Sequence, residues 1–309
     1  MNARVLLLAA AVILCPAIAP PSRSDSPPAA SAAAPTAAPS AAPTLADLKW
    51  QPGPMTAPLG DLARIEVPEG FVFLGAGDTR TFLELNENPT SGGELGIIIP
   101  AREGAEWFVV FEFNEVGYVK DEEKERLEAD PLLKTLREGN DRGNEVRRER
   151  GWATLEILGW QTEPHYDART NNLTWAILGE SQGRRIVNHS TRLLGRKGYM
   201  TVDLVLQPDL VATALPEFDA LMNGFSYGSG HRYAEFRSGD KIASYGLTAL
   251  VAGGAAAAAV KSGFLAKFWK VLVAAGLGLA AILRKLAARI FGHNETVVQG
   301  PPQGPGAAT

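Results

Sequence analysis

The sequence predicts an α+β domain, in which helices pack on an antiparallel sheet, followed by a C-terminal transmembrane helix. Short runs of β-branched and aromatic residues, bounded by turn residues, indicate strands. Stretches with apolar residues at helical spacing are interleaved with these runs, and this mixture is typical of helices packed on a sheet. A run without charged side chains at residues 242–260 has about the length of one bilayer crossing.

The N-terminus has the pattern of a secretory signal peptide. Arg4 precedes an apolar run and the small-x-small cleavage pattern AIA. Because Pro20 follows that pattern directly and fits a signal peptidase poorly, we place the end of the signal near residue 24. A lipoprotein would use Cys15, the single cysteine, but Leu14 before it is bulkier than lipidation favours. The exported chain would therefore form no disulfide within itself.

Composition divides the rest of the chain into a linker, a domain and a tail. Residues 25–44 consist mainly of Ala, Pro and Ser, which cannot bury enough apolar surface to order a chain, and they predict a disordered linker. Residues 45–238 carry the strand and helix patterns and have the size of one domain. Residues 293–309 are polar and rich in Pro and Gly, and we expect a disordered tail.

The elements of the domain are expected in a definite order. Strand-like runs lie at residues 63–74, 94–100, 107–116 and 153–160, with a helix at 78–88 after the first of them. The clearest topology lies at residues 173–206, where three strands are separated by the turns SQGR and GRKG, which predicts an antiparallel meander. A helix follows at residues 208–224, and Pro216 is expected to restart it at its first turn.

An acidic stretch at residues 117–133 contains six acidic and three basic side chains. Asp121 stands where a helix N-cap would, and the glutamates after it fall where carboxylates meet the positive end of a helix dipole. A second helix start follows, with Asp130 as its cap, Pro131 at its first position and Gly139 at its end. The alternating carboxylates and central glycine of an EF-hand are not present, so the stretch predicts solvated helix starts.

Candidates for catalysis are few. His165, Asp167 and His189 are the residues on which a hydrolase or a metal-dependent enzyme would rely, because an imidazole near a carboxylate is the usual way to orient a base. The sequence contains no HExxH motif, GxSxG elbow, phosphate-binding glycine loop or paired Cys/His ligands. We therefore predict no catalytic, cofactor-binding or metal-binding residue, and keep this trio as the alternative.

The apolar run at residues 242–260 is predicted to cross the membrane. Ala and Gly dominate it, so that its hydrophobicity is modest and it is expected to pack against another helix. Ala249, Gly253 and Ala257 form a ridge of small residues along which a second helix, or a second copy of the chain, can approach closely.

A second membrane-associated segment is expected at residues 264–291. It either crosses back, which makes a two-helix hairpin, or lies on the inner membrane surface. A return crossing would place Arg284, Lys285 and Arg289 outside, against the positive-inside rule. That rule favours a single crossing, and the sequence leaves the hairpin as an alternative.

Charge excludes one class of partner. The 30 basic residues are balanced by 34 acidic ones, without a basic patch, so no nucleic-acid binding is expected. The sequence predicts a protein of the bacterial inner (cytoplasmic) membrane with its main domain in the periplasm. Its expected partners are the lipid bilayer and a protein or cell-envelope component, and its expected role is that of a non-enzymatic binding or assembly module.

Several motifs occur in a recognisable order: GYVKDEEKERLEADPLL, LGW, LTWA, NHSTRLLGRKG and YGLTALVAGGAAAAAVKSG. This series, which covers the chain from about Trp50 to the predicted membrane helix, resembles the DUF2167 family of bacterial membrane-anchored proteins, defined only as a domain of unknown function. The resemblance implies a signal peptide, an exported domain and a C-terminal membrane anchor, and it supplies no activity, cofactor or catalytic residue. The family usually has a tyrosine at the position of His189, which weighs against a catalytic histidine pair.

Overall fold

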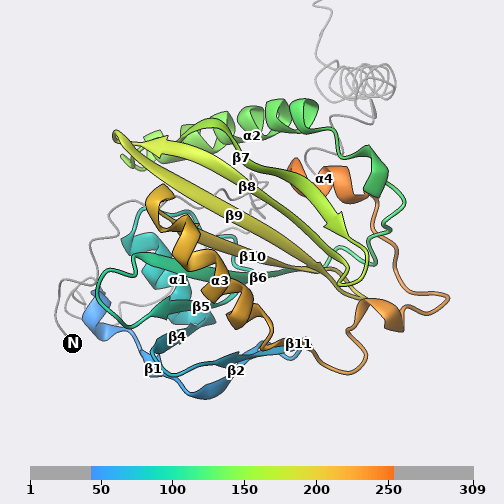
Figure 1. Cartoon of the computed structure of the whole chain (residues 1–309), viewed down its shortest axis with the longest axis horizontal. Helices are drawn as coiled ribbons and strands as arrows, with labels where there is room; N and C mark the ends of the chain where they lie inside the picture. The colour runs from blue at the N-terminus through green and yellow to red at the C-terminus, as the bar shows by residue number, and fades with distance from the viewer. Residues whose placement is uncertain (1–42, 254–309) are drawn as a thin grey trace, which may run out of the picture. The chain divides into compact units, whose positions relative to one another are not determined.

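The computed structural model describes residues 43–253. An eight-stranded antiparallel sheet forms its centre, with the strand order β1-β4-β5-β6-β10-β9-β8-β7 (Figure 1). The strands of this sheet are β1 (Gln51–Pro52), β4 (Phe71–Gly75), β5 (Glu94–Pro100), β6 (Trp107–Asn114), β7 (Glu156–Asp167), β8 (Asn172–Ser181), β9 (Arg184–Leu194) and β10 (Tyr199–Leu206).

A small sheet and four α-helices complete the described part of the chain. The small sheet has the order β11-β3-β2 and consists of β2 (Met55–Leu59), β3 (Ala63–Val67) and β11 (Phe225–Tyr227). The helices are α1 (Ala76–Leu85), α2 (Ala129–Glu149), α3 (Val211–Met222) and α4 (Leu247–Val251). Short 3-10 turns lie at Leu45–Asp47, Lys124–Arg126, Pro208–Leu210 and Tyr233–Glu235.

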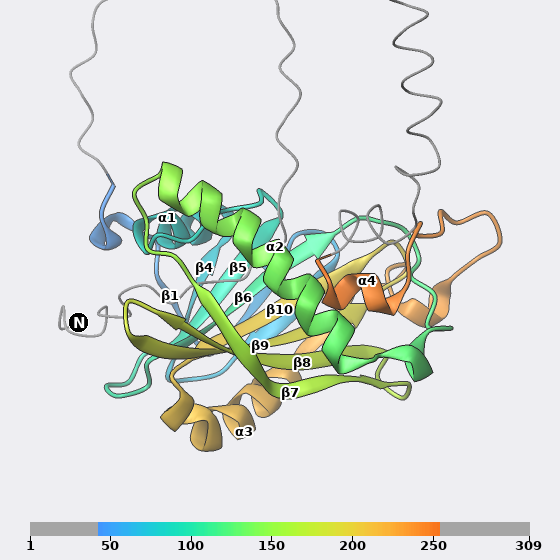
Figure 2. The ribbon, with the colours of Figure 1, turned by 90° about the horizontal axis from the view of Figure 1, so that it is seen from above.

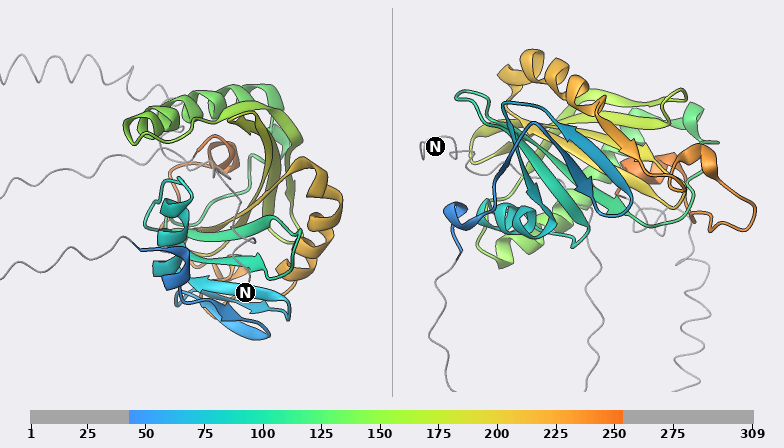
Figure 3. Two further views of the ribbon diagram at one scale, coloured as in Figure 1. Left: turned by 90° about the vertical axis from the view of Figure 1, so that its left-hand side faces the viewer. Right: turned by 90° about the horizontal axis from the view of Figure 1, so that it is seen from below.

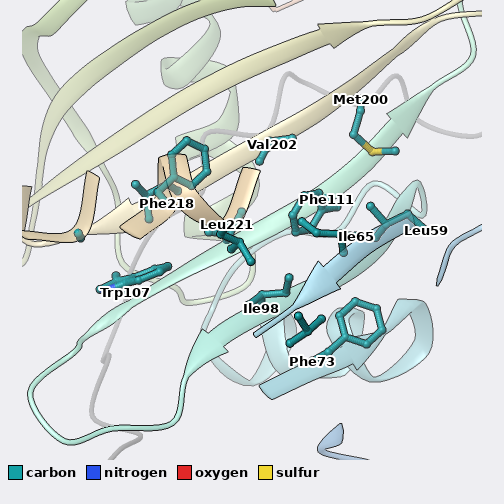
Figure 4. Packing of buried hydrophobic residues seen from close by; sticks show 14 of the residues in the cluster. Leu59, Ile65, Phe73, Ile98, Trp107, Phe111, Met200, Val202, Phe218 and Leu221 are labelled. Carbon is teal, nitrogen blue, oxygen red and sulfur yellow. The ribbon is translucent and has the colours of Figure 1, made fainter. Parts of the chain in front are cut away.

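One face of the large sheet, here called the outer face, packs against α3 and the small sheet. Cross-strand pairs such as Val202 with Phe111 place apolar side chains on this face. Phe218 and Leu221 of α3 and Ile65 of β3 cover them (Figure 4). The labelled side chains are buried, and this layer is the largest of the apolar clusters in the part of the chain that the structure describes.

The opposite, inner face is covered by α1, α2 and α4, as the end view shows (Figure 3). Phe82 of α1 packs over β4, β5 and β6, whereas Leu132 of α2 and Leu250 of α4 pack over β7 and β8. Two apolar clusters therefore lie on the two sides of this face. The central strands β6, β10 and β9 run between them.

Helix α2 runs along strand β7, at the edge of the sheet, and is fixed there by polar side chains (Figure 2). The Arg137 guanidinium donates to the carbonyl oxygens of Ile157 and Leu158, at 3.1 Å and 2.7 Å. The Asn144 amide donates to the Leu155 carbonyl at 2.7 Å and accepts from the Leu155 N–H at 2.9 Å. These bonds satisfy backbone groups that an edge strand would otherwise expose.

The structure confirms the α+β class and the meander. Strands β8, β9 and β10 pair antiparallel in sequence order, and Gly183 in the first turn has φ of +73°, which favours glycine. The predicted helix at 78–88 is α1. The run at 63–74, expected as one strand-like stretch, is divided between β3 and β4, which belong to different sheets and are separated by Gly70 with φ of +83°.

Two helix predictions are corrected. Helix α2 does not end at Gly139 but continues to Glu149. The bonds from Arg137 to Ile157 of β7 and from Asn144 to Leu155, just before β7, hold the helix on both sides of that glycine. Helix α3 does not restart at Pro216 but passes through it. Its buried residues Ala214, Phe218 and Leu221 lie on both sides of the proline, and their packing offsets the one backbone hydrogen bond that proline removes.

The described part of the predicted membrane helix at 242–260 is folded into the domain. Ile242 forms a parallel β-bridge with Tyr118, and α4 begins only at Leu247 and ends at Val251. Gly253 has φ of +98°, which a continuing helix would not allow. Within residues 43–253, no helix combines the length and the hydropathy that a membrane crossing needs.

The remaining terminal predictions fall on other parts of the chain. The signal peptide at 1–24, most of the linker at 25–44, the rest of the 242–260 segment, the 264–291 segment and the tail at 293–309 lie outside the described residues. Of the predicted ridge, Ala249 is buried against the domain, and Ala257 lies outside the described residues.

Candidate functional site

The structure places His165, Asp167 and His189 on one face of the sheet but does not assemble them into a catalytic group. His165 pairs with Thr174 in the β7–β8 register, and His189 pairs with Ala176 in the β8–β9 register, so both lie on the outer face. His165 is exposed on the edge strand, whereas His189 lies under α3 with its ring 5.5 Å from that of Phe218.

The partners of these residues are structural. Asp167 accepts from the Arg169 backbone N–H at 2.9 Å and from the guanidinium at 3.2 Å, and these bonds hold the pKa of Asp167 below its usual value. Burial lowers the pKa of His189, and the charge of His165 lowers it further, against the opposing effect of Asp219. No group of three or more His, Cys, Asp or Glu within residues 43–253 is placed to hold a metal ion.

A cavity of about 450 Å³ opens at the end of the sheet where the turn between β7 and β8 meets the segment after β11. Its wall combines apolar side chains with hydroxyl and amide groups, and Arg232 is its charged residue. The described residues that line it are Thr170, Asn171, Asn172, Leu193, Leu194, Met222, Phe225, Ser226, Tyr227, Arg232, Tyr233 and Ala234. A cavity of this size and lining can hold an organic group, and it contains no histidine, carboxylate or cysteine as a base or nucleophile.

A row of polar side chains crosses the centre of the inner face, and no motif in the sequence marks it. Register brings its members together, because Glu94 pairs with Glu112, Glu112 with Thr201, and Thr201 with Arg192. The inner polar row consists of Glu94, Glu112, Asn188, Ser190, Arg192, Thr201 and Asp203. It fills the strip between the two apolar clusters of that face.

Asp203 is the centre of this row. Its Oδ1 atom accepts from the Ser190 hydroxyl at 2.7 Å and from the Arg192 guanidinium at 3.2 Å. The carboxylate and the guanidinium are each only 7% exposed, and the guanidinium also stacks 4.7 Å from the ring centre of Trp175. Two charges taken out of water are tolerated here because they are paired and hydrogen-bonded.

The acidic side of the row carries a carboxyl group with a shifted pKa. Burial, together with the negative charges of Glu94 and Asp203, raises the pKa of Glu112 to about 7, against the lowering effects of Ser91 and Arg192. Glu94 is stabilised by loop donors, since the N–H groups of Ser91 and Gly92 both point at its carboxylate. Glu112 therefore titrates near neutral pH.

Asn188 ends the row next to Ser190. Its Oδ1 atom lies 3.4 Å from the Ser190 hydroxyl, and the residue is 5% exposed. Its Nδ2 atom is buried and finds no acceptor in the part of the chain that the structure describes. A buried donor of this kind is costly unless an acceptor meets it.

The acidic stretch at 117–133 fulfils its predicted structural role only in part. Asp121 caps no α-helix, and α2 begins at Ala129 with Glu128 as its N-cap. Glu123 instead reaches α4, where its carboxylate accepts from the Thr248 backbone N–H at 3.0 Å and from the Thr248 hydroxyl at 2.6 Å. Gly246 leaves room for this contact, since a Cβ atom there would lie 2.7 Å from the Glu123 carboxyl carbon. Glu123 thus supplies an N-cap from 125 residues away.

We expect Glu123→Ala to lower the free energy of unfolding by about 1–2 kcal/mol, the usual cost of losing a helix cap and its paired donors. Glu122→Ala and Glu125→Ala are the matched controls, because neither carboxylate contacts α4. Urea denaturation of the full chain in detergent, followed by tryptophan fluorescence, measures the difference. Equal losses for all three variants would show that general helix-end electrostatics, and not the contact with Thr248, stabilises this region.

Comparison with solved structures finds matches at low identity. The solution structure of cyanobacterial PsbP (CyanoP) from Synechocystis sp. PCC 6803 has a TM-score of 0.33 and 12% identity, over 59% of this chain and 92% of that chain. The Ran-binding protein Mog1p from Saccharomyces cerevisiae has a TM-score of 0.29 and 10% identity, over 57% and 93%. The apo immunity protein TplEi of the T6SS from Pseudomonas aeruginosa has a TM-score of 0.25 and 10% identity, over 56% and 75%.

Sequence comparison gives a clearer result. No curated protein matches the chain. The profile of a family described as "Protein of unknown function (DUF2167)" matches residues 51–284. The match covers all eight strands of the large sheet and extends beyond α4 into the apolar C-terminal sequence. The chain therefore belongs to the DUF2167 family.

Proposed function

We propose that the chain is a membrane-anchored protein of the bacterial cell envelope whose domain is a non-enzymatic binding or assembly module exposed to the periplasm. The observation that carries the binding role is the cavity at the end of the sheet. Its apolar wall, its amide and hydroxyl groups and the single cation of Arg232 suit an organic ligand with an anionic or hydrogen-bond-accepting end. No contact among the described residues favours the hydrolytic alternative, since His165, Asp167 and His189 each have separate partners.

The position of α4 changes the segment that we propose as the anchor. If residues 242–253 stay in the domain, only residues 254–260 of the predicted crossing remain, and seven residues of helix span about 10 Å. A bilayer core is about 30 Å thick, which residues 264–283 can span as twenty residues of helix. We therefore propose a single crossing by residues 264–283, which lie within the family match.

The signal peptide sets the orientation, because long exported domains translocate largely regardless of their charge. Arg284, Lys285 and Arg289 then follow the crossing on the cytoplasmic side, where basic residues are favoured. Lys267 and Lys270 stand near the start of the segment, and their long side chains can extend to the outer interface. In this arrangement the basic residues at the end of the segment obey the positive-inside rule.

Reporter fusions test the location. A phosphatase fused after residue 253 is expected to be active, and one fused after residue 309 is expected to be inactive, while a fluorescent protein at residue 309 should fluoresce. Activity of the phosphatase at residue 309 would place both ends outside and overturn the single crossing. Inactivity of the phosphatase fused after residue 253 would contradict export of the domain itself.

The binding role is tested separately with the full chain isolated from its own membranes in lipid nanodiscs. Mass spectrometry of the bound small molecules should find a species that is lost in Ser226→Trp, which fills the cavity. Val146→Trp is the control, since Val146 is an exposed residue of α2 outside the cavity. Identical sets of bound molecules in all three proteins would contradict a ligand in this cavity.

A further inference from the structure

The loop between β11 and α4 carries an exposed apolar surface. Phe236 is 38% exposed and Ile242 is 48% exposed, and they are two of the four large apolar side chains with this degree of exposure within residues 43–253. Both contact Tyr118, whose ring lies 4.3 Å from that of Phe236 and whose backbone forms the bridge with Ile242. We call Tyr118, Phe236 and Ile242 the end patch.

The end patch is held in a fixed position. Tyr233 stacks on Tyr118 at 4.5 Å, and its hydroxyl donates to the Val119 carbonyl at 3.0 Å. Arg196 forms two bonds of 2.7 Å with Asp240, and this carboxylate also accepts from the Arg237 backbone N–H. These contacts fix the loop that presents the patch, so its exposure is not the result of a loosely attached segment.

The exposed charges of the loop that carries Phe236 and Ile242 are positive, whereas Asp121 and Glu122 lie on the Tyr118 side of the patch. Arg232, Arg237 and Lys241 are exposed in the same loop. The two acidic residues of this loop have partners, since Asp240 binds Arg196 and Glu235 accepts from the N–H groups of Gly230 and Arg232. Exposed apolar side chains framed by cations are complementary to an anionic phospholipid surface.

The proposed anchor follows shortly after this end of the domain in the sequence. The loop and α4 lie at the same end of the sheet in both views (Figures 1 and 2). Gly253 is eleven residues after Ile242, and eleven further residues lead to Phe264, where the proposed crossing begins. Eleven residues reach at most about 40 Å when fully extended. A short tether of this kind makes even a weak contact with the bilayer effective.

We propose that the end patch docks the domain on an anionic phospholipid bilayer, with Phe236 and Ile242 in the interface and Arg237 and Lys241 against the headgroups. This inference rests on the proposed anchor, because the anchor supplies the bilayer next to the patch. Docking would fix the orientation of the domain, and it would bring Arg232, which lines the cavity and belongs to the same loop, close to the lipid surface.

Site-specific fluorescence on the full chain tests the docking. In a Cys15→Ser background, Phe236→Cys is labelled with an environment-sensitive dye, and the protein is reconstituted in vesicles of phosphatidylcholine alone or mixed equally with phosphatidylglycerol. The dye should shift to shorter wavelength in the anionic vesicles and be quenched several-fold more by nitroxide lipids than in the zwitterionic ones. Val146→Cys on α2 is the matched control, an equally exposed apolar position whose dye should report water in both lipids.

Charge reversal completes the test. Arg237→Glu together with Lys241→Glu should abolish the lipid dependence at position 236, whereas Arg142→Glu with Arg148→Glu on α2 should leave it unchanged. A dye at position 236 that behaves like the one at position 146 would overturn the proposal. A dye at position 236 that responds to protein concentration instead of lipid charge would also overturn it, and would indicate that a second copy of the chain covers the end patch. Carbonate extraction of the same vesicles distinguishes failure of the anchor from failure of docking. A chain that stays in the lipid while its end patch is exposed to water is anchored but not docked.

Discussion

Asp203→Ala is expected to lower the free energy of unfolding by about 3–5 kcal/mol, the usual cost of removing one partner of a buried ion pair. The substitution leaves the Arg192 side chain, which is 7% exposed, without its carboxylate partner, and it removes the nearer acceptor of the Ser190 hydroxyl. The Thr191 carbonyl at 3.4 Å and the ring of Trp175 are too weak to replace a charge partner. Urea denaturation of the full chain in detergent measures the loss.

A double variant separates the ion pair from general packing. Asp203→Leu with Arg192→Leu removes both charges and should cost much less than the sum of the two single variants, because no buried charge is left without a partner. Asp167→Ala provides the control for an exposed pair, since Arg169 is 90% exposed, and it should change stability little. A loss for Asp203→Ala no larger than that for Asp167→Ala would contradict the structural importance of the inner polar row.

The stability of the domain should fall between pH 4.5 and pH 7 through Glu112. The pKa of its carboxyl group is raised from 4.5 to about 7, so the folded state binds this proton more tightly than the unfolded state does. The stabilisation is complete below the unfolded pKa and is lost as the pH rises through the folded pKa. A shift of this size corresponds to a change of about 3 kcal/mol at most. The groups that face this carboxyl are Glu94, Asp203, Arg192 and Ser91.

Glu112→Gln tests this linkage, because glutamine has the same shape and does not titrate. The difference in unfolding free energy between wild type and variant should be small at pH 5 and should favour the variant by about 1–3 kcal/mol at pH 8. Carboxyls with lowered pKa values, such as Asp240 at about 2, act only at lower pH and with the opposite sign. A difference that does not change between pH 5 and pH 8 would mean that the carboxyl has an ordinary pKa in the folded protein.

The meander could be predicted because the residues that specify each of its strands and turns lie close together in the sequence. The alternation along β8 to β10 and the glycines in the turns specify strand, turn and partner within a few residues. The inner polar row could not be predicted from local sequence patterns. Ser190, Arg192 and Asp203 alternate along their strands as ordinary polar positions do, and only the register of β9 with β10 places them in contact.

Hydropathy predicts a membrane location for the segment at 242–253 because it reports only that a run of residues avoids water. Protein and lipid provide the same apolar environment for Leu247, Leu250 and Val251, which are at most 2% exposed in the domain. The distinguishing contact is Glu123, which lies far away in sequence and caps α4. No pattern within the segment contains that information.

Residues 242–253 belong to the domain, and we propose that residues 264–283 anchor it. Ending the chain after Lys261 tests this claim most directly, because it keeps all of residues 242–260 and removes the proposed anchor. We expect the shortened protein to be exported and released in the soluble periplasmic fraction, while the full chain stays in carbonate-washed membranes. Retention of the shortened protein in those membranes would mean that residues 242–260 cross the bilayer and that residues 264–283 are not needed as the anchor.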